Sequence, residues 1–451
     1  MFNKVLVANR GEIALRILRA CKELGIETVA IHSSIDEDSL HVRYADQSVC
    51  VGSANSSDSY LNITSIISAA EITGVDAIHP GYGYLAENAE FAEICQACNI
   101  AFIGPSAHHI KLMGQKIFAI KQAKESGVPV ILGSNKVVTS LEDALTIADS
   151  IGYPIMLKAV AGGGGKGVKL IETNEVLESS FDIIKTETRN AFKNDELYIE
   201  KFIKNPRHIE AQIIADQHQN VVHLGDRECS IQRRNQKLVE EAQAANMPAK
   251  VREELLESAV KIAKNIGYYS AGTVEFLMDD DYNFYFLEMN TRIQVEHPVS
   301  EYITGIDIVK EQIKVASGAE LSLSQSDITF SGHSIECRIN AEDPLTFLPS
   351  PGKINEINLP GGPGVRVDTA IYRGYKVSPY YDSMLAKLIV HDKSRGEAIL
   401  RMKRALDEFY IEGISSTIQT CQMVLESEEF NSGRYNTYDL PKIISKATEE
   451  K

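Results

Sequence analysis

The sequence predicts a multidomain protein of the α/β and α+β classes, and three observations support this prediction. Residues 1–33 alternate short apolar runs with an amphipathic helical pattern, which is typical of a parallel α/β domain. Residues 197–244 alternate apolar and polar side chains with a period of two, as antiparallel strands do. From residue 331 onwards, prolines and glycines interrupt short strand patterns, which indicates a third, β-rich α+β domain.

The composition is that of an ordinary globular protein with two or three domains. The chain has 451 residues, of which 44% are apolar and 24% charged, and its formal net charge is −16. This negative charge disfavours nonspecific binding to nucleic acid or to an anionic membrane. No apolar run is long enough to span a membrane, and the N-terminus lacks the apolar region of a signal peptide, so we expect a cytoplasmic protein.

The seven cysteines are scattered along the chain. Cys95 and Cys98 form a CxxC pair, but the pair falls inside a predicted helix and no second pair lies nearby. A structural zinc site needs four ligands, so we expect no metal or redox role for this pair. Cys229 has no base beside it in the sequence and is predicted to be unreactive.

The N-terminal domain begins with a β-α-β pattern. KVLVAN and TVAIHS are strand-like, and helical spacing of Ile13, Ile17, Cys21 and Leu24 gives the segment between them one buried face. The first turn, ANRGEIA, holds a single glycine where a dinucleotide fold uses GxGxxG, so we expect no nicotinamide cofactor. A later loop, AIHPGYGYLAEN, is either a ligand-binding loop or a plain turn.

A glycine-rich loop marks the start of the central region. A helix is predicted near Gln115 and carries Lys116, and YPIMLKAVAGGGGKGVKLI then predicts a strand, a loop and a strand, with Lys158 ending the first strand. The consecutive glycines Gly162 to Gly165 cost backbone entropy, so we interpret them as a lid that approaches phosphates closely. The loop is not a Walker motif, because no helix follows it. A flexible linker is the alternative.

The antiparallel segment at 197–244 carries more polar and charged side chains than a solvated sheet face needs. These residues are Glu200, Lys201, His208, Glu210, Gln232, Arg233, Arg234 and Lys237. A final stretch, SRGEAILRMKRALDEFYIEG, is predicted to be an amphipathic helix.

Two further strands, GTVEFLM and YFLEM, are joined by the turn cluster DDDYN. If Asp281 and Tyr282 centre that turn, Glu275 lies directly opposite Glu288, with Cβ atoms about 5 Å apart, and like charges in such a pair repel. The period of two puts Asn290 on the same side as Glu288. Mg²⁺ or Mn²⁺ bound by these oxygen ligands would compensate the repulsion. The alternative is a polar strand face in solvent.

The loop after this hairpin is rich in hydrogen-bond donors and contains Arg292, Gln294, Val295 and Glu296. Arginine offers a planar fork to a small planar anion, and the carboxylate of Glu296 could remove a proton from that anion. With the lid, two lysines and a metal hairpin, the pattern indicates ATP–Mg²⁺ and the activation of a small oxyanion by phosphoryl transfer. The predicted reaction class is that of a ligase.

The chain resembles the biotin carboxylase component of biotin-dependent carboxylases, in the ATP-grasp superfamily. The resemblance covers nearly the whole length and includes ANRGEIALRILRACKELGI, AIHPGYGYLAEN, GGGGKG, EMNTRIQVEHPVSE, ECRINAEDP, LPSPGKI and YYDSMLAKL. It implies a Rossmann-like N-terminal domain (1–114), an ATP-grasp domain (115–329) with a mobile glycine-rich lid at about 131–203, and a C-terminal biotin carboxylase domain (330–447).

The resemblance also implies an activity. ATP and bicarbonate would form carboxyphosphate, which carboxylates biotin on a separate carrier protein. We expect the first half-reaction of acetyl-CoA carboxylase, which leads to malonyl-CoA and fatty acid synthesis. The alternatives are the same half-reaction for a pyruvate, propionyl-CoA or other acyl-CoA carboxylase, a different ATP-grasp ligase that joins a carboxylate to an amine, and a degenerate paralogue that only binds nucleotide. No biotinylation segment or carboxyltransferase region is evident in the sequence, so we expect a biotin carboxyl carrier protein and carboxyltransferase subunits as partners, and a homodimer.

Site roles follow from the resemblance, position by position. The ATP-binding residues would be Lys116, Lys158, Gly163, Gly164, Gly165, Glu200, Lys201, Ile203, His208, Gln232, Asn235 and Leu277, with Glu275 and Glu288 beside them. The metal ligands would be Glu275, Glu288 and Asn290. Bicarbonate would contact Lys237, Arg292, Gln294, Val295 and the base Glu296, and biotin would contact Tyr82, Gln294 and Arg338. The catalytic residues would be Glu296, Arg338, Lys237 and Arg292. For Arg338 the alternative is an internal ion pair, for example with Asp382.

The chain departs from the family pattern in two places near this site. Asn235 stands where the family usually has a histidine that contacts ribose, and EEAQAANMP replaces a proline-rich EEAPAP, with Gln243 in place of a proline. Asparagine keeps a hydrogen bond but loses the packing of the ring, and the lost proline loosens the loop that carries Lys237. We therefore expect weaker ATP binding without loss of catalysis. Lys166 replaces the common arginine of the lid, which should matter little.

Overall fold

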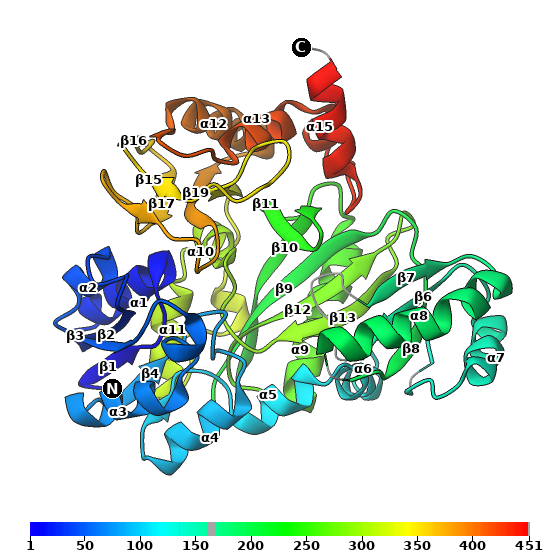
Figure 1. Ribbon diagram of the computed structural model, residues 1–451, viewed down its shortest axis with the longest axis horizontal. Coiled ribbons are helices and arrows are strands. Elements are labelled where there is room, and N and C mark those ends of the chain that lie inside the picture. The colour runs from blue at the N-terminus through cyan, green and yellow to red at the C-terminus, as the bar shows by residue number, and fades with distance from the viewer. Residues whose placement is uncertain (135, 161–166, 193, 450–451) are drawn as a thin grey trace.

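The computed structural model describes residues 1–134, 136–160, 167–192 and 194–449. Figure 1 shows the N-terminal domain in blue below the C-terminal region in yellow, orange and red, with the green strands of a long sheet beside them and a smaller helix-covered sheet at the far end. Within the described ranges, none of the helices has both the length and the apolar character that a membrane span requires.

The N-terminal domain is a five-stranded parallel sheet in the order β3-β2-β1-β4-β5. Its strands are β1 (Lys4–Val7), β2 (Glu27–Ser33), β3 (Gln47–Gly52), β4 (Ala77–His79) and β5 (Ala101–Phe102), and its helices are α1 (Gly11–Glu23), α2 (Leu40–Tyr44), α3 (Ile63–Thr73), α4 (Ala89–Ala97) and α5 (Ala107–Gly114). The predicted β-α-β unit is confirmed, because β1 pairs in parallel with β2 and Ile13, Ile17 and Cys21 of α1 are buried. The CxxC pair begins in α4, as predicted, although Cys98 is its C-cap.

The central structure is an eight-stranded antiparallel sheet in the order β13-β12-β9-β10-β11-β14-β19-β17. Its strands are β9 (Arg207–Ala215), β10 (Val221–Arg233), β11 (Gln236–Ala242), β12 (Ser270–Met278), β13 (Phe284–Asn290), β14 (His333–Asn340), β17 (Val365–Thr369) and β19 (Met384–Asp392). Helices α6 (Lys116–Glu125), α9 (Ala249–Asn265), α10 (His297–Thr304) and α11 (Ile308–Ala316) pack on it. β11 lies before the domain boundary predicted between residues 329 and 330, and β14 lies after it. Because these two strands pair, one sheet contains strands from both predicted domains.

A separate three-stranded sheet, β7-β6-β8, forms the predicted lid region. It contains β6 (Ile155–Ala159), β7 (Val168–Ile171), β8 (Leu197–Lys201), α7 (Leu141–Ile151) and α8 (Asn174–Phe192). The predicted strand–loop–strand is confirmed, because β6 and β7 are antiparallel. The prediction that 197–201 belongs with the following strands is wrong, because β8 pairs with β6 instead. The period of two fixes a strand but not its partner.

The C-terminal region adds two small sheets and four helices to the edge of the large sheet. The strands are β15 (Gly352–Lys353), β16 (Glu356–Asn358), β18 (Lys376–Val377) and β20 (Tyr410–Glu412), and the helices are α12 (Arg395–Glu408), α13 (Ile418–Glu426), α14 (Glu428–Ser432) and α15 (Asp439–Glu449). The predicted helix at 394–413 is correct as far as Glu408. Beyond it the helical prediction is wrong, because Tyr410 to Glu412 pair with β16, and tertiary pairing overrides local preference.

Candidate active site

The predicted glutamate pair is present on the hairpin of β12 and β13. Glu275 is the direct cross-strand partner of Glu288, and Thr273 is the partner of Asn290. Glu275 is buried, whereas Glu288 is exposed to solvent. The hairpin therefore places two carboxylates side by side at the end of the large sheet, as the turn length predicted.

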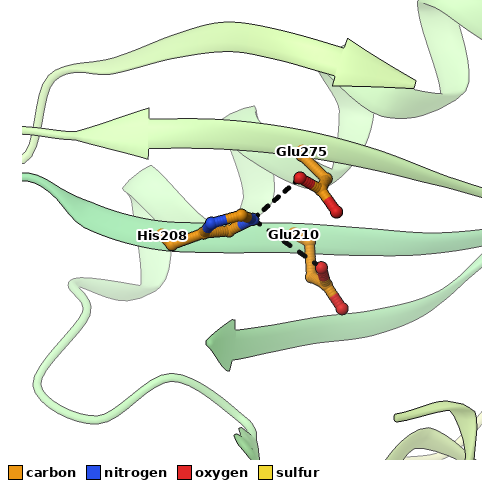
Figure 2. A group of neighbouring side chains, drawn as sticks. All are labelled: His208, Glu210 and Glu275. Atoms are coloured by element: carbon orange, nitrogen blue, oxygen red, sulfur yellow. Dashed lines mark ion pairs between the residues drawn. The ribbon is translucent and has the colours of Figure 1, made fainter. Parts of the chain in front are cut away.

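Protein cations compensate the charge of Glu275. Its carboxylate lies 3.0 Å from His208 Nε2 and 3.0 Å from Lys237 Nζ, and it accepts hydrogen bonds from Gln294 at 2.8 Å and Asn290 at 3.0 Å. Figure 2 shows His208 between Glu275 and Glu210, whose Oε2 is 3.9 Å from the same ring nitrogen. Burial raises the pKa of the Glu275 carboxyl, but Lys237 and His208 outweigh burial and hold the pKa well below its ordinary value. Glu275 is therefore ionised.

Glu288 has no hydrogen bond or ion pair to any described residue, so its oxygens are available for a cation. Although part of the side chain is exposed, neighbouring atoms remove much of the solvent around the carboxyl, and this desolvation, followed by the charge of Glu275, raises the pKa of Glu288. Asn290 donates to Glu275 through Nδ2, and its Oδ1 accepts from Arg292 Nη2 at 3.0 Å. The donor set of two carboxylates and one amide oxygen suits Mg²⁺ or Mn²⁺. A cation bound there would lower the raised pKa of Glu288. The residues fit the predicted metal.

The predicted phosphate-binding lysines lie on two elements that face each other. Lys158 of β6 forms a 2.5 Å ion pair with the buried Glu200 of β8, and Lys116 at the start of α6 lies over the ring of Tyr198, 5.4 Å from its centroid. Burial raises the pKa of Glu200, but Lys158 and Lys116 together lower it below its ordinary value. Lys201 is committed elsewhere, because its Nζ donates to the carbonyls of Gly152 and Tyr153 at 2.9 and 3.0 Å.

The remaining nucleotide candidates are positioned by strands and turns of the same region. Leu277 is the strand partner of His208, and Gln232 is the partner of Lys237. Asn235 is exposed in the two-residue turn between β10 and β11, where its φ is 65°. Asparagine adopts this left-handed conformation more readily than most residues, which gives a structural reason for its presence. Ile203 is half-buried after β8, and Gly163, Gly164, Gly165 and Lys166 lie outside the described residues.

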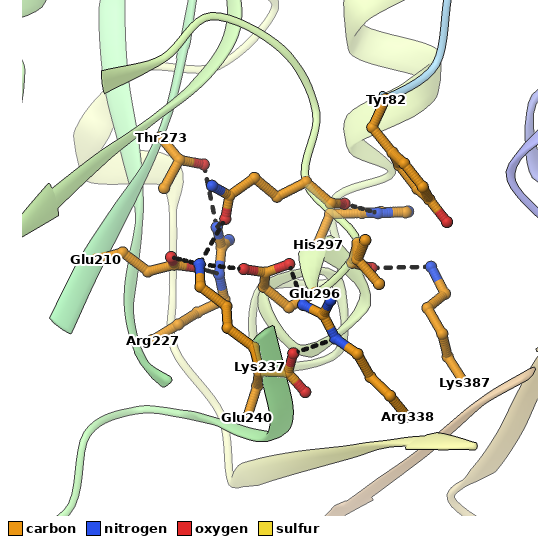
Figure 3. Close-up of polar contacts among 12 residues, drawn as sticks. Tyr82, Glu210, Arg227, Lys237, Glu240, Thr273, Glu296, His297, Arg338 and Lys387 are labelled. Carbon is orange, nitrogen blue, oxygen red and sulfur yellow. Dashed lines mark hydrogen bonds and ion pairs between the residues drawn. The ribbon is translucent and has the colours of Figure 1, made fainter. Parts of the chain in front are cut away.

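Lys237 of β11 is the centre of the candidate anion site. Its Nζ lies 2.6 Å from Glu210, 3.0 Å from Glu275 and 2.6 Å from Glu296, and 3.4 Å from the amide oxygen of Gln294. Figure 3 shows Glu210 and Glu296 on either side of the ammonium group of Lys237. Burial lowers the pKa of Lys237, but the three carboxylates raise it well above its ordinary value, so the ammonium stays charged.

Arg292 and Val295 lie beside Lys237 with partners of their own. Arg292 is held by Glu87, with Nε 2.9 Å from Oε2, and by Asn290. The carbonyl of Val295 accepts from the buried Lys387 at 2.9 Å. The loop is thereby fixed from both the N-terminal domain and the C-terminal region.

Glu296 and Arg338 form the far end of this network. Glu296 accepts from Lys237 through Oε1 and from Arg338 Nη2 at 3.0 Å through Oε2. Burial raises the pKa of Glu296, yet Lys237 and Arg338 hold it far below its ordinary value. Arg338 is also paired with Glu240 at 2.5 Å. Arg338 thus forms internal ion pairs, as the alternative interpretation expected, but the suggested partner Asp382 is wrong. Its partners are Glu240 and Glu296, and strand pairing that the sequence does not reveal brings Glu240 close.

Tyr82 reaches the network through the N-terminal domain. Its hydroxyl donates to Glu12 of α1, and Glu12 lies 3.2 Å from Lys387 Nζ. Tyr82 and Lys387 appear on the side of Glu296 remote from Glu210 (Figure 3). The predicted biotin contacts Tyr82, Gln294 and Arg338 therefore surround the loop that carries Glu296.

Sequence reasoning missed Arg227, a fully buried cation of the site. Arg227 of β10 is 0% exposed and donates to Glu210 at 2.5 Å, Gln212 at 2.6 Å and Thr273 at 3.1 Å. The available signal was the run Asp226-Arg227-Glu228 in the middle of a predicted strand, since charges in a central strand are buried only when paired. Cys229, beside it, is buried, and burial first of all raises the pKa of its thiol well above the ordinary value, consistent with an unreactive side chain.

Three family models match the chain in sequence order. Biotin carboxylase, N-terminal domain, matches residues 1–110, carbamoyl-phosphate synthase L chain, ATP binding domain, matches residues 115–324, and biotin carboxylase C-terminal domain matches residues 336–442. Biotin carboxylase 1 of Bacillus subtilis (strain 168) is 56% identical over 97% of this chain and 98% of its own length. The chain belongs to the biotin carboxylase family. The predicted resemblance and ligase class are thereby confirmed.

Solved biotin carboxylase structures confirm the predicted fold class. A biotin carboxylase complex with β,γ-ATP from Campylobacter jejuni superposes with a TM-score of 0.95 at 50% identity, covering 98% of this chain and 99% of that one. The biotin carboxylase domain dimer of the 2-oxoglutarate carboxylase of Hydrogenobacter thermophilus, in complex with MgADP, ADP and bicarbonate, gives a TM-score of 0.94 at 49% identity with the same coverages. The individual site residues and domain boundaries stay predictions.

Proposed function

We propose that this chain uses ATP and bicarbonate to carboxylate biotin carried by a biotin carboxyl carrier protein. One observation carries the proposal: Lys237 joins the metal-type hairpin at Glu275 to the proton acceptor Glu296 through a single ammonium group, with both contacts at or below 3.0 Å. A phosphoryl donor bound at the hairpin and an oxyanion bound at the loop would therefore be adjacent.

Bicarbonate would enter this network by competing for the cations that hold Glu296. Its negative oxygens suit the ammonium of Lys237 and the guanidinium of Arg292, with the amide of Gln294 and the backbone of Val295 completing the contact. When bicarbonate engages Lys237, that cation stabilises the Glu296 carboxylate less, so the pKa of Glu296 rises from its depressed value and the group becomes a better proton acceptor. Binding of the substrate anion thus prepares the base.

Glu275, Glu288 and Asn290 would hold Mg²⁺ or Mn²⁺. Such an ion neutralises phosphate oxygens and stabilises the charge that develops during phosphoryl transfer. On the nucleotide side, Lys116 and Lys158 would neutralise phosphate charge, and His208, Gln232, Asn235, Ile203 and Leu277 would line the cleft. Lys158 already pairs with Glu200, which keeps the ammonium oriented before nucleotide arrives.

Arg338 would face the biotin ureido group after carboxyphosphate has formed. Its Nη2 edge points at Glu296, so substrate bound beside Glu296 lies within reach of the guanidinium. A fixed cation there would stabilise the enolate oxygen that develops on biotin.

We propose acetyl-CoA carboxylase as the complex that this chain serves, with a carboxyltransferase and a homodimer of this subunit. The match to the biotin carboxylase domain of a 2-oxoglutarate carboxylase leaves the acceptor open, and pyruvate or propionyl-CoA carboxylase would use the same half-reaction. Affinity capture with this chain, followed by identification of the biotinylated carrier and its transferase, separates these alternatives.

The activity is tested by steady-state ATP cleavage with purified protein. We expect phosphate release that requires bicarbonate and Mg²⁺ and that free biotin stimulates, and we expect Glu296→Ala to abolish it. Phosphate release with an amino acid but without bicarbonate would favour the carboxylate–amine ligase. A parent protein as inactive as Glu296→Ala would indicate a nucleotide-binding paralogue.

A further inference from the structure

The sheet face beneath α10 carries a buried carboxylate, Glu336, that forms no ion pair with any described residue. Glu336 of β14 is 0% exposed, and neither of its carboxylate oxygens has a hydrogen-bond partner among the described residues. Glu240 of β11 is its direct partner in the antiparallel register, and the Oε2 atom of Glu240 is also unpartnered. Two ionised carboxylates facing each other at a Cβ separation of about 5 Å would repel strongly in so dry a place.

The cations on this face are already engaged. Arg338 pairs with Glu240 at 2.5 Å and Glu296 at 3.0 Å, Lys387 with Glu12 at 3.2 Å, and Arg366 with Asp368 at 2.6 Å and Glu301 at 2.7 Å. The other titratable or charged groups that face Glu336 or its neighbours from the surrounding elements are Lys237, Cys229, His297 and Tyr82. These cations form their ion pairs with other carboxylates, and Glu336 is without one among the described residues.

A proton on Glu336 would remove the repulsion between the two carboxylates and would also provide a hydrogen bond between their unpartnered oxygens. A protonated Glu336 has one O–H donor, and the unpartnered Oε2 of Glu240 is a free acceptor directly across the strand. Burial raises the pKa of Glu336 well above its ordinary value; the charges of Lys387 and Arg338 oppose this rise, and the charge of Glu240 adds to it. Burial also raises the pKa of Glu240, to about 7. Because Glu240 accepts the 2.5 Å hydrogen bond from Arg338 Nε, Glu240 is the member that stays ionised.

We propose that Glu240 and Glu336 share one proton and act together as a positioning pair for Arg338. Glu336 donates to Oε2 of Glu240, and Glu240 holds the Nε edge of Arg338 through Oε1, which leaves the Nη2 edge directed at Glu296. Glu296 changes its own protonation when it serves as the base, so Glu240 is the contact that remains constant during turnover. This role rests on the proposed function, because it acts through Arg338.

The shared proton is tested without enzyme activity. In the unfolded chain Glu336 ionises near its ordinary pKa of 4.5, whereas in the folded chain its pKa lies well above that value. The folded state therefore loses relative stability as pH rises from about 4.5 toward the folded pKa. Glu336→Gln removes this loss, so the Tm of the variant relative to wild type should increase from about pH 5 to about pH 8. A Tm difference that does not change with pH would overturn the shared proton.

The positioning role is tested by biotin kinetics of the full-length enzyme. Glu240→Gln should lower kcat/KM for biotin by about tenfold or more, since it removes a charged hydrogen bond to Arg338, while KM for ATP stays within about twofold. Glu336→Leu should lower kcat/KM for biotin because Glu240 loses its donor. Glu336→Gln should restore most of it, because an amide N–H replaces the acid O–H.

Glu241→Gln is the matched control. Glu241 is the next residue of β11, is equally buried, and contacts His333, Arg395 and Tyr435 on the opposite face. It should reduce stability without changing kcat/KM for biotin. If Glu240→Gln behaves like Glu241→Gln, the positioning role is overturned. Wild-type protein without biotin-stimulated turnover would overturn the proposed function and the positioning role with it, whereas the Tm comparison still decides whether the proton is shared.

Discussion

Replacing Glu241 by glutamine should lower the stability of the folded chain by about 3 kcal/mol at neutral pH. Glu241 is fully buried and accepts hydrogen bonds from His333 at 2.7 Å, Arg395 at 2.7 Å and the hydroxyl of Tyr435 at 2.6 Å. These three partners come from β14, the start of α12 and the segment before α15, so one carboxylate fastens the central strand β11 to the C-terminal region.

The magnitude follows from the pKa of this carboxyl. Burial raises it, but His333 and Arg395 outweigh burial and lower the pKa from 4.5 to about 2. Each tenfold change in proton affinity is worth about 1.4 kcal/mol, so this pKa corresponds to about 3 kcal/mol of stabilisation. A depressed pKa stabilises the folded state above the unfolded value of 4.5, and the contribution is lost as pH falls toward 2.

Urea titration followed by circular dichroism measures the effect. The midpoint for Glu241→Gln should lie well below that of wild type at pH 7, and the difference should shrink to about a third near pH 3. Glu257→Gln is the control, because Glu257 is an exposed helix residue whose nearest cation, Lys261, lies 3.4 Å away at the surface. Equal midpoints for Glu241→Gln and wild type at pH 7, or a difference that does not depend on pH, would refute this reasoning.

Three further predictions concern the candidate site. Asn235→His should lower KM for ATP in steady-state assays, because a ring restores packing at the turn, and an unchanged or higher KM would contradict the account of this departure. Glu288→Gln should raise the Mg²⁺ concentration needed for half-maximal activity by about tenfold or more, while Glu288→Asp should do so less; Mg²⁺ titration of phosphate release measures both. Arg227→Met should destabilise the protein by about 3 to 5 kcal/mol, because it leaves Glu210 with Lys237 as its remaining close cation; thermal unfolding of Arg227→Met beside Arg233→Met, a partly exposed arginine of the same strand, measures this.

Local patterns predicted those parts of the molecule in which neighbours in sequence are also neighbours in space. The register of Glu275 with Glu288 followed from the length of one turn, and the β-α-β start followed from two apolar runs and one helical face. The prediction failed where partners are distant: Leu197 to Lys201 pair with β6, and Tyr410 to Glu412 pair with β16.

The candidate site shows the same division. The resemblance indicated which residues are proposed to contact substrates, and the structure brings Lys237, Glu275, Glu296 and Arg338 into one network. The residues that form ion pairs with these side chains could not be predicted in the same way. Glu240 contacts Arg338 although 98 positions separate them, and Arg227 reaches Gln212 and Thr273 on neighbouring strands. Strand pairing rather than sequence spacing brings these groups together.

The eight-stranded sheet joins the central and C-terminal regions through continuous backbone hydrogen bonding (Figure 1). Lys237 and Arg338 belong to adjacent paired strands, β11 and β14, so the backbone hydrogen bonds of the sheet fix the spacing between the proposed bicarbonate and biotin contacts. A chain cut at residue 329 would keep β11 but expose its edge, with a row of unpaired amides and carbonyls that invites aggregation. The fragment that ends at residue 329 should therefore precipitate. In the described ranges, no strand pairing joins the sheet of β6, β7 and β8 to the eight-stranded sheet, so this smaller sheet is the part that could move to open or close the proposed site.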